Sequence, residues 1–344
     1  MNRLLLLALV ACASACQTPP MPAPEAAPAD CSYTHVRTQD AVQAGGVHWV
    51  ELREGYRVWT KQFGNNPDMN VLLLHGGPSC THEYMESFES FFPQANIAFI
   101  EYDQLGSYYS DQPSDSSLWT IERFVEEVEQ VRTALELDEH NFYLLGHSWG
   151  GILALEYALK YQDRMKGLIV SNMTADFHKY AAYNAELRSQ FRPSLIDSLE
   201  VYENAGDFLN PAYEALVTEH YYRKHVCRLQ EWPEAVGRTF KHLNYDVYSY
   251  MQGPSEFVPG GILKDWTVWD RLGELEVPTL TVGAAYDTMK PAEMEEMSTL
   301  VQRGRYHHCP NGSHMAHWDD QEVYMEGVVA FIHDVNDGDF SDAK

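Results

Sequence analysis

At 344 residues, the chain is long enough for one large α/β domain that carries an insertion, or for two domains. Hydrophobic residues make up 45% of it and aromatic residues 12%, which fits a globular enzyme and excludes a disordered chain or a membrane bundle. The formal net charge of −26 argues against nucleic acid as a partner, and it favours cationic substrates and a well-solvated acidic surface.

The first residues predict an export signal and not a part of the fold. Arg3 supplies a positive charge, and the apolar run at residues 4–11 is too short to span a bilayer. We therefore assign residues 1–16 to a signal peptide with a lipobox and the Pro/Ala-rich residues 17–34 to an extended tether. After cleavage of the signal, we expect an exported bacterial protein. It is either periplasmic or an outer-membrane lipoprotein that contacts the membrane only through its lipid.

Two kinds of cleavage site compete in this segment. The sequence LVAC at 9–12 resembles a bacterial lipobox and predicts lipidation of Cys12, with Cys16 as a second, poorer candidate. The alternative is an ordinary signal-peptidase site after the sequence ASA at 13–15, which would leave the protein without a lipid. Lipidation is the favoured prediction.

Export also permits disulfides. Four cysteines lie beyond the signal: Cys31, Cys80, Cys227 and Cys309. They can form two disulfides in three ways, and the sequence favours none of these. The densest histidines, at 307–308 and at 314 and 317, lack zinc-like spacing, and no glycine-rich nucleotide motif occurs. We therefore expect neither a metal nor a cofactor.

Apolar runs alternate with helical periodicity in two stretches, residues 35–173 and 266–344, which predicts a mostly parallel sheet flanked by helices. Strands are expected at 71–74, 97–100, 142–145, 167–170, 279–282 and 305–307, and helices at 121–135, 152–158 and 323–332. Residues 174–265 lack strand-like runs and show helical patterns, for example at 213–229. They are expected to form a helical cap inserted in the α/β domain.

The sequence GHSWG at 146–150 lies between a predicted strand and a predicted helix, a context typical of a nucleophile elbow. The turn needs small residues on both sides of the serine, because a Cβ there would collide with the neighbouring strand and helix. It raises the Ser148 hydroxyl out of the sheet and directs the amide of Trp149 to the place where an oxyanion forms. Gly77, in the HGGP turn at 75–78, is expected to supply the second oxyanion donor.

A serine nucleophile needs a base, and the base needs an acid that orients it. In hydrolases with an elbow these residues follow in the order Ser, Asp, His. Asp287 comes just after one predicted strand and His314 just after the next, at the sheet edge where open α/β sheets bind ligands. We expect acyl transfer in which His314 takes the proton of Ser148; His317 is the rival base.

The chain resembles the prolyl iminopeptidase family of α/β-hydrolases, which are serine peptidases that release an N-terminal residue, often proline. The resemblance covers roughly residues 45–332. It rests on five motifs: HGGP at 75–78, YDQLGS at 102–107, GHSWGG at 146–151, QGPSEF at 252–257 and PNGSH at 310–314. It implies an α/β-hydrolase fold and the activity of this family.

The resemblance also implies that Glu256, in the cap, accepts the protonated amine of the substrate's first residue through a charge-assisted hydrogen bond. It places Asp103 and Gln104 at the pocket floor as structural residues. Besides the D-Q-x-G loop, which continues as SYYS at 107–110 in place of the commoner glycine-containing version, the chain departs from the family pattern at two positions. Ser79 follows the HGGP turn where the family usually has glycine, and Thr288 stands where many members have a second amine-binding glutamate.

These residues together predict a serine aminopeptidase that takes an N-terminal residue, with proline expected, from short peptides through an acyl-enzyme on Ser148. Because Thr288 replaces one carboxylate, the alternative is an amidase, esterase or lactonase acting on small amino-acid-derived molecules. A non-enzymatic binding lipoprotein is the third hypothesis. Three aromatic residues are candidates to stack on a proline ring, although core packing is their ordinary role: Tyr183, Trp232 and Trp266.

Overall fold

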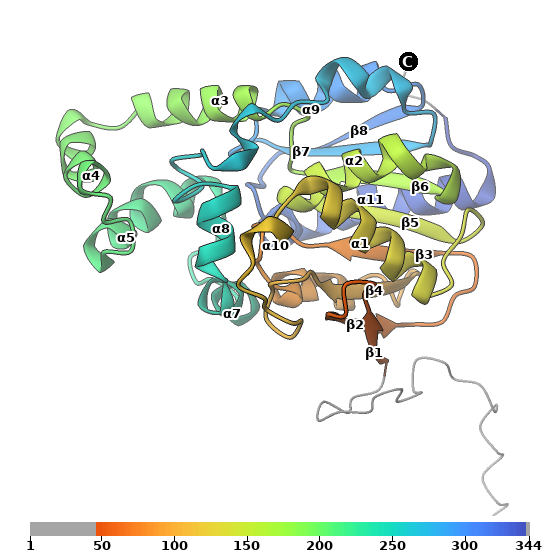
Figure 1. Ribbon diagram of the computed structural model, residues 1–344. Coiled ribbons are helices and arrows are strands. Elements are labelled where there is room, and N and C mark those ends of the chain that lie inside the picture. The colour runs from red at the N-terminus through yellow and green to blue at the C-terminus, as the bar shows by residue number, and fades with distance from the viewer. Residues whose placement is uncertain (1–45, 342–344) are drawn as a thin grey trace, which may run out of the picture. The chain divides into compact units, whose positions relative to one another are not determined.

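The computed structural model describes residues 46–341, which belong to one compact unit built around a central sheet (Figure 1). The eight strands lie in the order β1-β2-β4-β3-β5-β6-β7-β8. β2 pairs antiparallel with β1 and β4, and all other neighbours pair parallel, which confirms the predicted sheet. The strands are β1 (Val47–Glu51), β2 (Arg57–Phe63), β3 (Asn70–Leu74), β4 (Ala98–Asp103), β5 (Phe142–His147), β6 (Gly167–Ser171), β7 (Thr279–Ala284) and β8 (Gly304–Cys309).

The six strands predicted from the sequence correspond to β3 through β8. Every residue of β3, β5 and β6 is buried, because helices cover both faces of the sheet at these strands. The antiparallel hairpin of β1 and β2 was not predicted. Its sequences, VHWVE and RVWTKQF, mix polar with apolar residues and leave several side chains partly exposed, so they lack a continuous apolar run.

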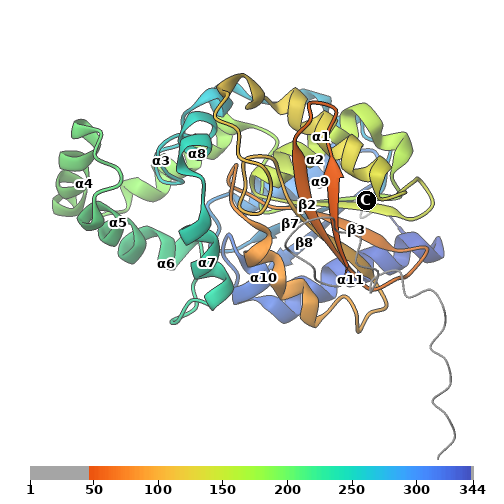
Figure 2. The same ribbon diagram turned by 60° about the horizontal axis from the view of Figure 1, so that its bottom comes forward.

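Helices lie on both faces of the sheet (Figure 2). One face carries α1 (Ile121–Ala134), α2 (Trp149–Tyr161) and α9 (Pro291–Leu300), and the other carries the 3-10 helix η2 (His82–Ser90) and α11 (Gln321–Asp337). Three short helices complete the α/β part: η3 (Ser116–Leu118), η4 (Gln162–Arg164) and α10 (Ala316–Asp319). Each face is joined to its helices by a buried apolar cluster, represented by Val128 and Leu153 on the first face and by Phe88 and Phe331 on the second.

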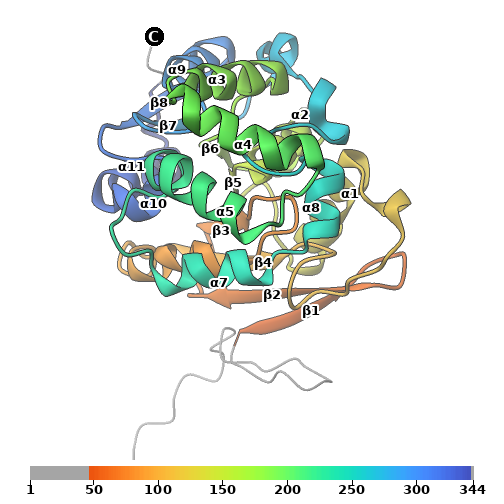
Figure 3. The same ribbon diagram turned by 90° about the vertical axis from the view of Figure 1, so that its left-hand side faces the viewer.

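The segment between β6 and β7 is helical and lies in front of the sheet in Figure 3. Its elements are α3 (Phe177–Ser189), α4 (Pro193–Ala205), α5 (Pro211–Val217), the π-helical turn η5 (Thr218–Tyr222), α6 (Arg223–His225), α7 (Glu234–His242), α8 (Tyr245–Met251), η6 (Ile262–Asp265) and η7 (Trp269–Glu274). The elements from α3 to η6 lie within residues 174–265, the range assigned to the cap. The helical pattern noted at 213–229 corresponds to α5, η5 and α6, but the π turn η5 interrupts the regular helix, and α6 ends at His225, before the pattern does.

Three of the four cysteines considered for disulfides, Cys80, Cys227 and Cys309, are free thiols. Cys31 lies outside the described residues, as do the predicted signal, the lipobox cysteines and the tether. Within residues 46–341, no helix is long and apolar enough to cross a membrane. The same residues hold no group of three or more His, Cys, Asp or Glu side chains that could bind a metal ion.

Candidate active site

Ser148 occupies the sharp turn between β5 and α2. Its backbone angles, φ 56° and ψ −127°, lie in a region that residues with a side chain rarely adopt. The flanking glycines explain how the turn fits. A Cβ on Gly146 would lie 2.0 Å from the carbonyl oxygen of Gly150, and a Cβ on Gly150 would lie 2.1 Å from that of Leu74. The absence of these side chains lets α2 begin directly beside the strands, with Ser148 at the carboxyl end of the sheet.

Asp287 follows β7, His314 follows β8, and their side chains meet. Nδ1 of His314 donates to Oδ1 of Asp287 at 2.8 Å. The Asp287 carboxylate also accepts from the backbone N–H of Met289 at 3.1 Å and from the side-chain amide of Asn172 at 2.7 Å. The Thr288 hydroxyl donates to Oδ1 at 3.4 Å, so four donors fix a fully buried carboxylate, and Nε2 of His314 is the ring nitrogen that Asp287 does not engage.

The groups around His314 determine its protonation state. Burial disfavours the charged form of His314, but the charge and hydrogen bond of Asp287, together with the charges of Glu256 and Asp319, outweigh burial and hold the pKa of His314 above its ordinary 6.5. The rival base, His317, is also buried, and its ring packs against those of Tyr84 and His147. Burial lowers the pKa of His317 to about 3. The structure therefore pairs Asp287 with His314 and leaves His317 as a neutral packing residue.

The cap holds the loop that carries His314. The backbone N–H groups of His314 and Met315 donate to the carbonyl oxygens of His225 and Val226 at 2.9 and 2.8 Å. Oγ of Ser313 donates to the same carbonyl of Val226 at 2.9 Å. These carbonyls are available because α6 ends at His225, and the last carbonyls of a helix have no partner within it. The end of the helical segment at His225, which the sequence did not predict, thus leaves carbonyl groups free to bind the loop of His314.

Two backbone amides are candidates for the oxyanion hole, as expected from the sequence. Trp149 is the first residue of α2, so its N–H has no acceptor within the helix and lies at the positive end of the helix dipole. Gly77 has φ +114°, and a Cβ there would lie 2.5 Å from the nitrogen of Cys80, so only glycine fits. The neighbouring N–H of Gly76 is already used, because it donates to the hydroxyl of Tyr84 at 2.6 Å. Gly77 and Trp149 remain as the pair of donors.

Ser79, the first departure from the family pattern, keeps the backbone conformation that glycine would have. Its φ is 61°, in the left-handed region. Its hydroxyl donates to the carbonyl oxygen of Asn244 at 2.7 Å, and Asn244 caps the N-terminus of α8. The serine therefore adds a hydrogen bond between the oxyanion turn and the cap.

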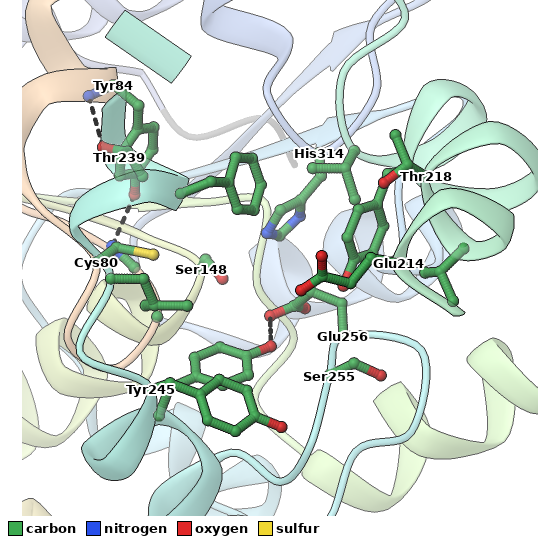
Figure 4. Close-up of a pocket in the computed structure, with 18 of the residues that line it drawn as sticks. Cys80, Tyr84, Ser148, Glu214, Thr218, Thr239, Tyr245, Ser255, Glu256 and His314 are labelled. Carbon is green, nitrogen blue, oxygen red and sulfur yellow. Dashed lines mark hydrogen bonds between the residues drawn. The ribbon is translucent and has the colours of Figure 1, made fainter. Parts of the chain in front are cut away.

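A cavity of about 470 Å³ lies between the sheet and the cap, with Ser148 and His314 among the residues that line it (Figure 4). The cap supplies a mainly apolar wall, which includes Tyr213, Val217, Tyr222, Trp232, Phe240 and Tyr245. Of the three aromatic residues considered for stacking, Trp232 lines this cavity. Tyr183 and Trp266 pack in hydrophobic clusters instead. The cavity suits a small apolar ring next to the nucleophile.

Two cap carboxylates, Glu256 and Glu214, reach this cavity (Figure 4). Oε1 of Glu256 accepts from the hydroxyl of Tyr248 at 2.9 Å, and Oε2 accepts from the hydroxyl of Tyr180 at 2.8 Å. Each oxygen keeps a further lone pair, so the carboxylate is oriented and still able to accept from a cation. Thr288, the second departure, is fully buried and supplies no carboxylate.

Asp103 and Gln104 are buried and hydrogen-bonded to structural partners, but they are not among the residues that line the cavity, so the expected place at its floor is not observed. Asp103 accepts from His82 Nδ1 at 2.9 Å. Gln104 accepts from the indole N–H of Trp149 at 2.8 Å, and its side-chain amide donates to the carbonyl oxygen of His75 at 2.9 Å. Gln104 therefore joins the start of α2 to the residue that opens the oxyanion turn.

Sequence reasoning missed several residues that hold the site. Asn172, which binds Asp287, is a polar residue directly after the buried strand β6, and its place at the carboxyl edge of the sheet was a usable signal. Tyr180 and Tyr248, which bind Glu256, carry no such signal. They are two of many cap aromatics, and their 68-residue separation hides that they share one partner.

Comparison with known proteins agrees with this geometry. The family model described as alpha/beta hydrolase fold matches residues 70–321. A proline iminopeptidase of Flavobacterium johnsoniae is 58% identical over 283 residues, covering 82% of this chain and 95% of that protein. A proline iminopeptidase of Elizabethkingia meningoseptica is 56% identical over 288 residues, covering 83% and 97%. The solved structure of a proline iminopeptidase of Mycobacterium smegmatis superposes with a TM-score of 0.77 at 28% identity, covering 85% of this chain and 99% of that one.

Proposed function

Because this chain belongs to the proline iminopeptidase family of α/β-hydrolases, we propose that it is a serine aminopeptidase that releases N-terminal proline from short peptides. The observation that carries this proposal is that the oriented carboxylate of Glu256 lines the same cavity as Ser148 and His314. A carboxylate at this place binds the ammonium of the first residue while the nucleophile faces the adjacent carbonyl carbon.

In the proposed complex, the secondary ammonium of the substrate proline donates to Glu256, and the pyrrolidine ring lies against the apolar cap wall. The carbonyl oxygen points to the amides of Gly77 and Trp149. Since these donors are backbone groups of a tight turn and a helix start, they are oriented before the substrate arrives. Donors of this kind stabilise the charge that develops on the oxygen, and each is worth roughly 10² to 10³ in rate.

The reaction then follows two acyl transfers. Nε2 of His314 takes the hydroxyl proton as Oγ of Ser148 attacks the carbonyl carbon. The tetrahedral intermediate collapses, the C–N bond breaks, and His314 returns the proton to the leaving amine, which leaves a prolyl ester on Ser148. Water attacks this ester with His314 as base again, and free proline departs. No step requires a metal or a cofactor.

The direct test compares proline p-nitroanilide with its N-acetylated counterpart, with Ser148→Ala as the control. We expect the purified protein to cleave only the compound with a free amine, and the alanine variant to cleave neither. Hydrolysis of a p-nitrophenyl ester through Ser148, with no cleavage of either anilide, would overturn the aminopeptidase assignment. That result would support the alternative, an esterase or lactonase on the same scaffold.

We further propose that the protein is exported and lipidated at Cys12, with Cys16 as the second candidate. The support is the sequence alone: a positive residue, a short apolar run and the LVAC lipobox. Full-length protein made in a bacterial host with labelled palmitate should carry label in the membrane fraction, and Cys12→Ser should abolish the label. Label that persists in Cys12→Ser and is lost in Cys16→Ser would move the site, and unlabelled cytoplasmic protein would contradict export.

A further inference from the structure

Acyl transfer at this site requires that three loops keep fixed relative positions: the oxyanion turn, the elbow and the loop of His314. Two buried side chains outside the triad connect all three. The N–H of Gly76 donates to the Tyr84 hydroxyl at 2.6 Å, and that hydroxyl lies 2.8 Å from Nδ1 of His147. Nε2 of His147 lies 2.8 Å from the carbonyl oxygen of His314. We call this series of bonds the Tyr84–His147 link.

Chemistry fixes the direction of each bond in the link. The carbonyl oxygen of His314 only accepts, so Nε2 of His147 carries the ring proton. In the neutral ring, which burial favours, Nδ1 is then an acceptor and receives a hydrogen bond from the Tyr84 hydroxyl, whose oxygen accepts from the N–H of Gly76. The link thus needs one tautomer of neutral His147. Burial agrees with this, because it lowers the pKa of His147 well below the ordinary 6.5.

Tyr84 is itself held by both the cap and the core. Its backbone N–H donates to Oγ1 of Thr239, on α7, at 3.2 Å (Figure 4). Its carbonyl oxygen accepts from the indole N–H of Trp318, on α10, at 2.7 Å. The side chain is 1% exposed. The Tyr84 hydroxyl is therefore a fixed point from which the link can set the position of the oxyanion turn.

We propose that Tyr84 and His147 are positioning residues that set the Gly77 amide and the His314 ring at the separation that the tetrahedral intermediate needs. The inference rests on the proposed function. At one end, the bond from Gly76 to the Tyr84 hydroxyl fixes the orientation of that peptide group and so orients the next one, that of Gly77. At the other end, the bond to the carbonyl of His314 fixes the backbone from which the imidazole projects.

The link predicts a loss in kcat without a loss in substrate binding, because the substrate ammonium binds elsewhere, at Glu256. Tyr84→Phe removes the hydroxyl and keeps the ring. We expect kcat for proline p-nitroanilide to fall about 10- to 100-fold while KM stays within about two-fold, as for misplaced oxyanion donors. His147→Gln should give a similar loss. The double variant should lose no more than the larger single loss, because both changes interrupt one link.

A matched control is Tyr143→Phe, which removes another buried tyrosine hydroxyl, one that donates to the carbonyl oxygen of Ile332 at 3.2 Å and does not line the cavity. Its kcat should stay within about two-fold of the wild type. A second readout separates positioning from general packing. Affinity for pyrrolidine-2-boronic acid, which mimics the tetrahedral intermediate, should fall with kcat in Tyr84→Phe, whereas affinity for proline should be retained.

An unchanged kcat in Tyr84→Phe, an equal loss in Tyr143→Phe, or losses that multiply in the double variant would overturn the link. If Tyr84→Phe fails to fold, His147→Gln and its boronate affinity decide the question in the same way. If the wild type does not cleave proline p-nitroanilide, the proposed function fails separately. The same variants are then compared on a p-nitrophenyl ester hydrolysed through Ser148, because an oxyanion forms with any acyl substrate.

Discussion

Ser148 is a weak nucleophile by itself, and its proposed reactivity comes from the groups around it. Its positive φ directs the hydroxyl away from the sheet, and the Asp287–His314 pair supplies a base with one fixed tautomer. The two amides expected at the oxyanion hole come from backbone that glycine and a helix start leave without other partners. The chemistry of this residue is therefore a property of the loops that meet at the sheet edge.

At the residue scale, Glu256 should act on binding and not on the acyl transfer itself. Glu256→Gln replaces an ionised acceptor with a neutral one. It should lower kcat/KM for proline p-nitroanilide about 10- to 100-fold, mainly through KM, since a hydrogen bond to a charged group contributes about 1.5–3 kcal/mol. Hydrolysis of a p-nitrophenyl ester without an amine should be unchanged. Steady-state kinetics of both substrates measure the difference.

Glu214 is the matched control for that experiment. It lines the same cavity from α5, but its side chain is exposed, and in the described part of the chain no side chain donates a hydrogen bond to its carboxylate. Glu214→Gln should therefore change kcat/KM by less than about three-fold, because exposed charges interact weakly. Equal losses in the two variants would contradict the special role given to Glu256.

The charge of His314 gives a second prediction at this scale. Burial opposes the charged imidazolium, but Asp287, with smaller contributions from Glu256 and Asp319, outweighs burial and raises the pKa of His314 above 6.5. The base must be neutral to act, so as pH falls, kcat/KM should decline through that raised pKa. NMR titration of the His314 ring in Ser148→Ala should show it directly. In Ser148→Ala with Asp287→Asn, burial acts without the carboxylate, so the pKa should drop; an unchanged value would contradict the coupling.

Among the residues of the site, the three candidates for the triad could be predicted from the sequence, whereas the residues that hold them in place by hydrogen bonds could not. Ser148 and Asp287 follow the buried strands β5 and β7, and His314 follows the partly exposed β8, so the alternation of strands and helices places all three at one edge of the sheet. Tyr84 and His147 are 63 positions apart, and their bond depends on how η2 packs against the elbow. No local pattern carries that information, because it arises only when distant segments are packed together.

At the scale of elements, the elbow depends on how closely α2 approaches the strands. Gly146→Ala would place a methyl group 2.0 Å from the carbonyl oxygen of Gly150, so backbone must move. We expect a loss of about 2–4 kcal/mol in the free energy of unfolding, as for severe overpacking. Urea denaturation followed by circular dichroism measures it.

Gly237→Ala is the control for this prediction. Gly237 is exposed within α7, and an added Cβ would meet nothing within 4 Å. Alanine favours the helix over glycine by about 0.8–1.0 kcal/mol, so this variant should be as stable as the wild type or more stable. A Gly146→Ala protein that unfolds at the same urea concentration as Gly237→Ala would show that the close approach at the elbow has no energetic weight.

Some elements of this fold can be predicted from the sequence better than others. β3, β5 and β6 are covered on both faces and appear as continuous apolar runs, whereas the partly exposed β1–β2 hairpin does not. The cap was recognised by composition and helical patterns. Its interruption at Thr218–Tyr222 was not, because the residues there are compatible with a regular helix, and the carbonyls of His225 and Val226 are bound by a loop about 90 residues away.

At the scale of the whole molecule, the cavity belongs to no single part of the chain. The core supplies the nucleophile, the base and the oxyanion turn, and the cap supplies the apolar wall and Glu256. Several hydrogen bonds cross between the two parts, including those of Ser79 to Asn244 and of His314 to His225. The cap therefore both lines the cavity and holds the loops of Ser79 and His314 in place.

The central claim is that Ser148 carries the proline acyl group during turnover. The most direct measurement is mass spectrometry of the protein quenched while it turns over a proline p-nitrophenyl ester, followed by digestion to locate the adduct. We predict one prolyl group on the peptide that contains Ser148, none in Ser148→Ala, and a much smaller yield with the N-acetylated ester. A prolyl group on another residue, or turnover that persists in Ser148→Ala, would contradict the account.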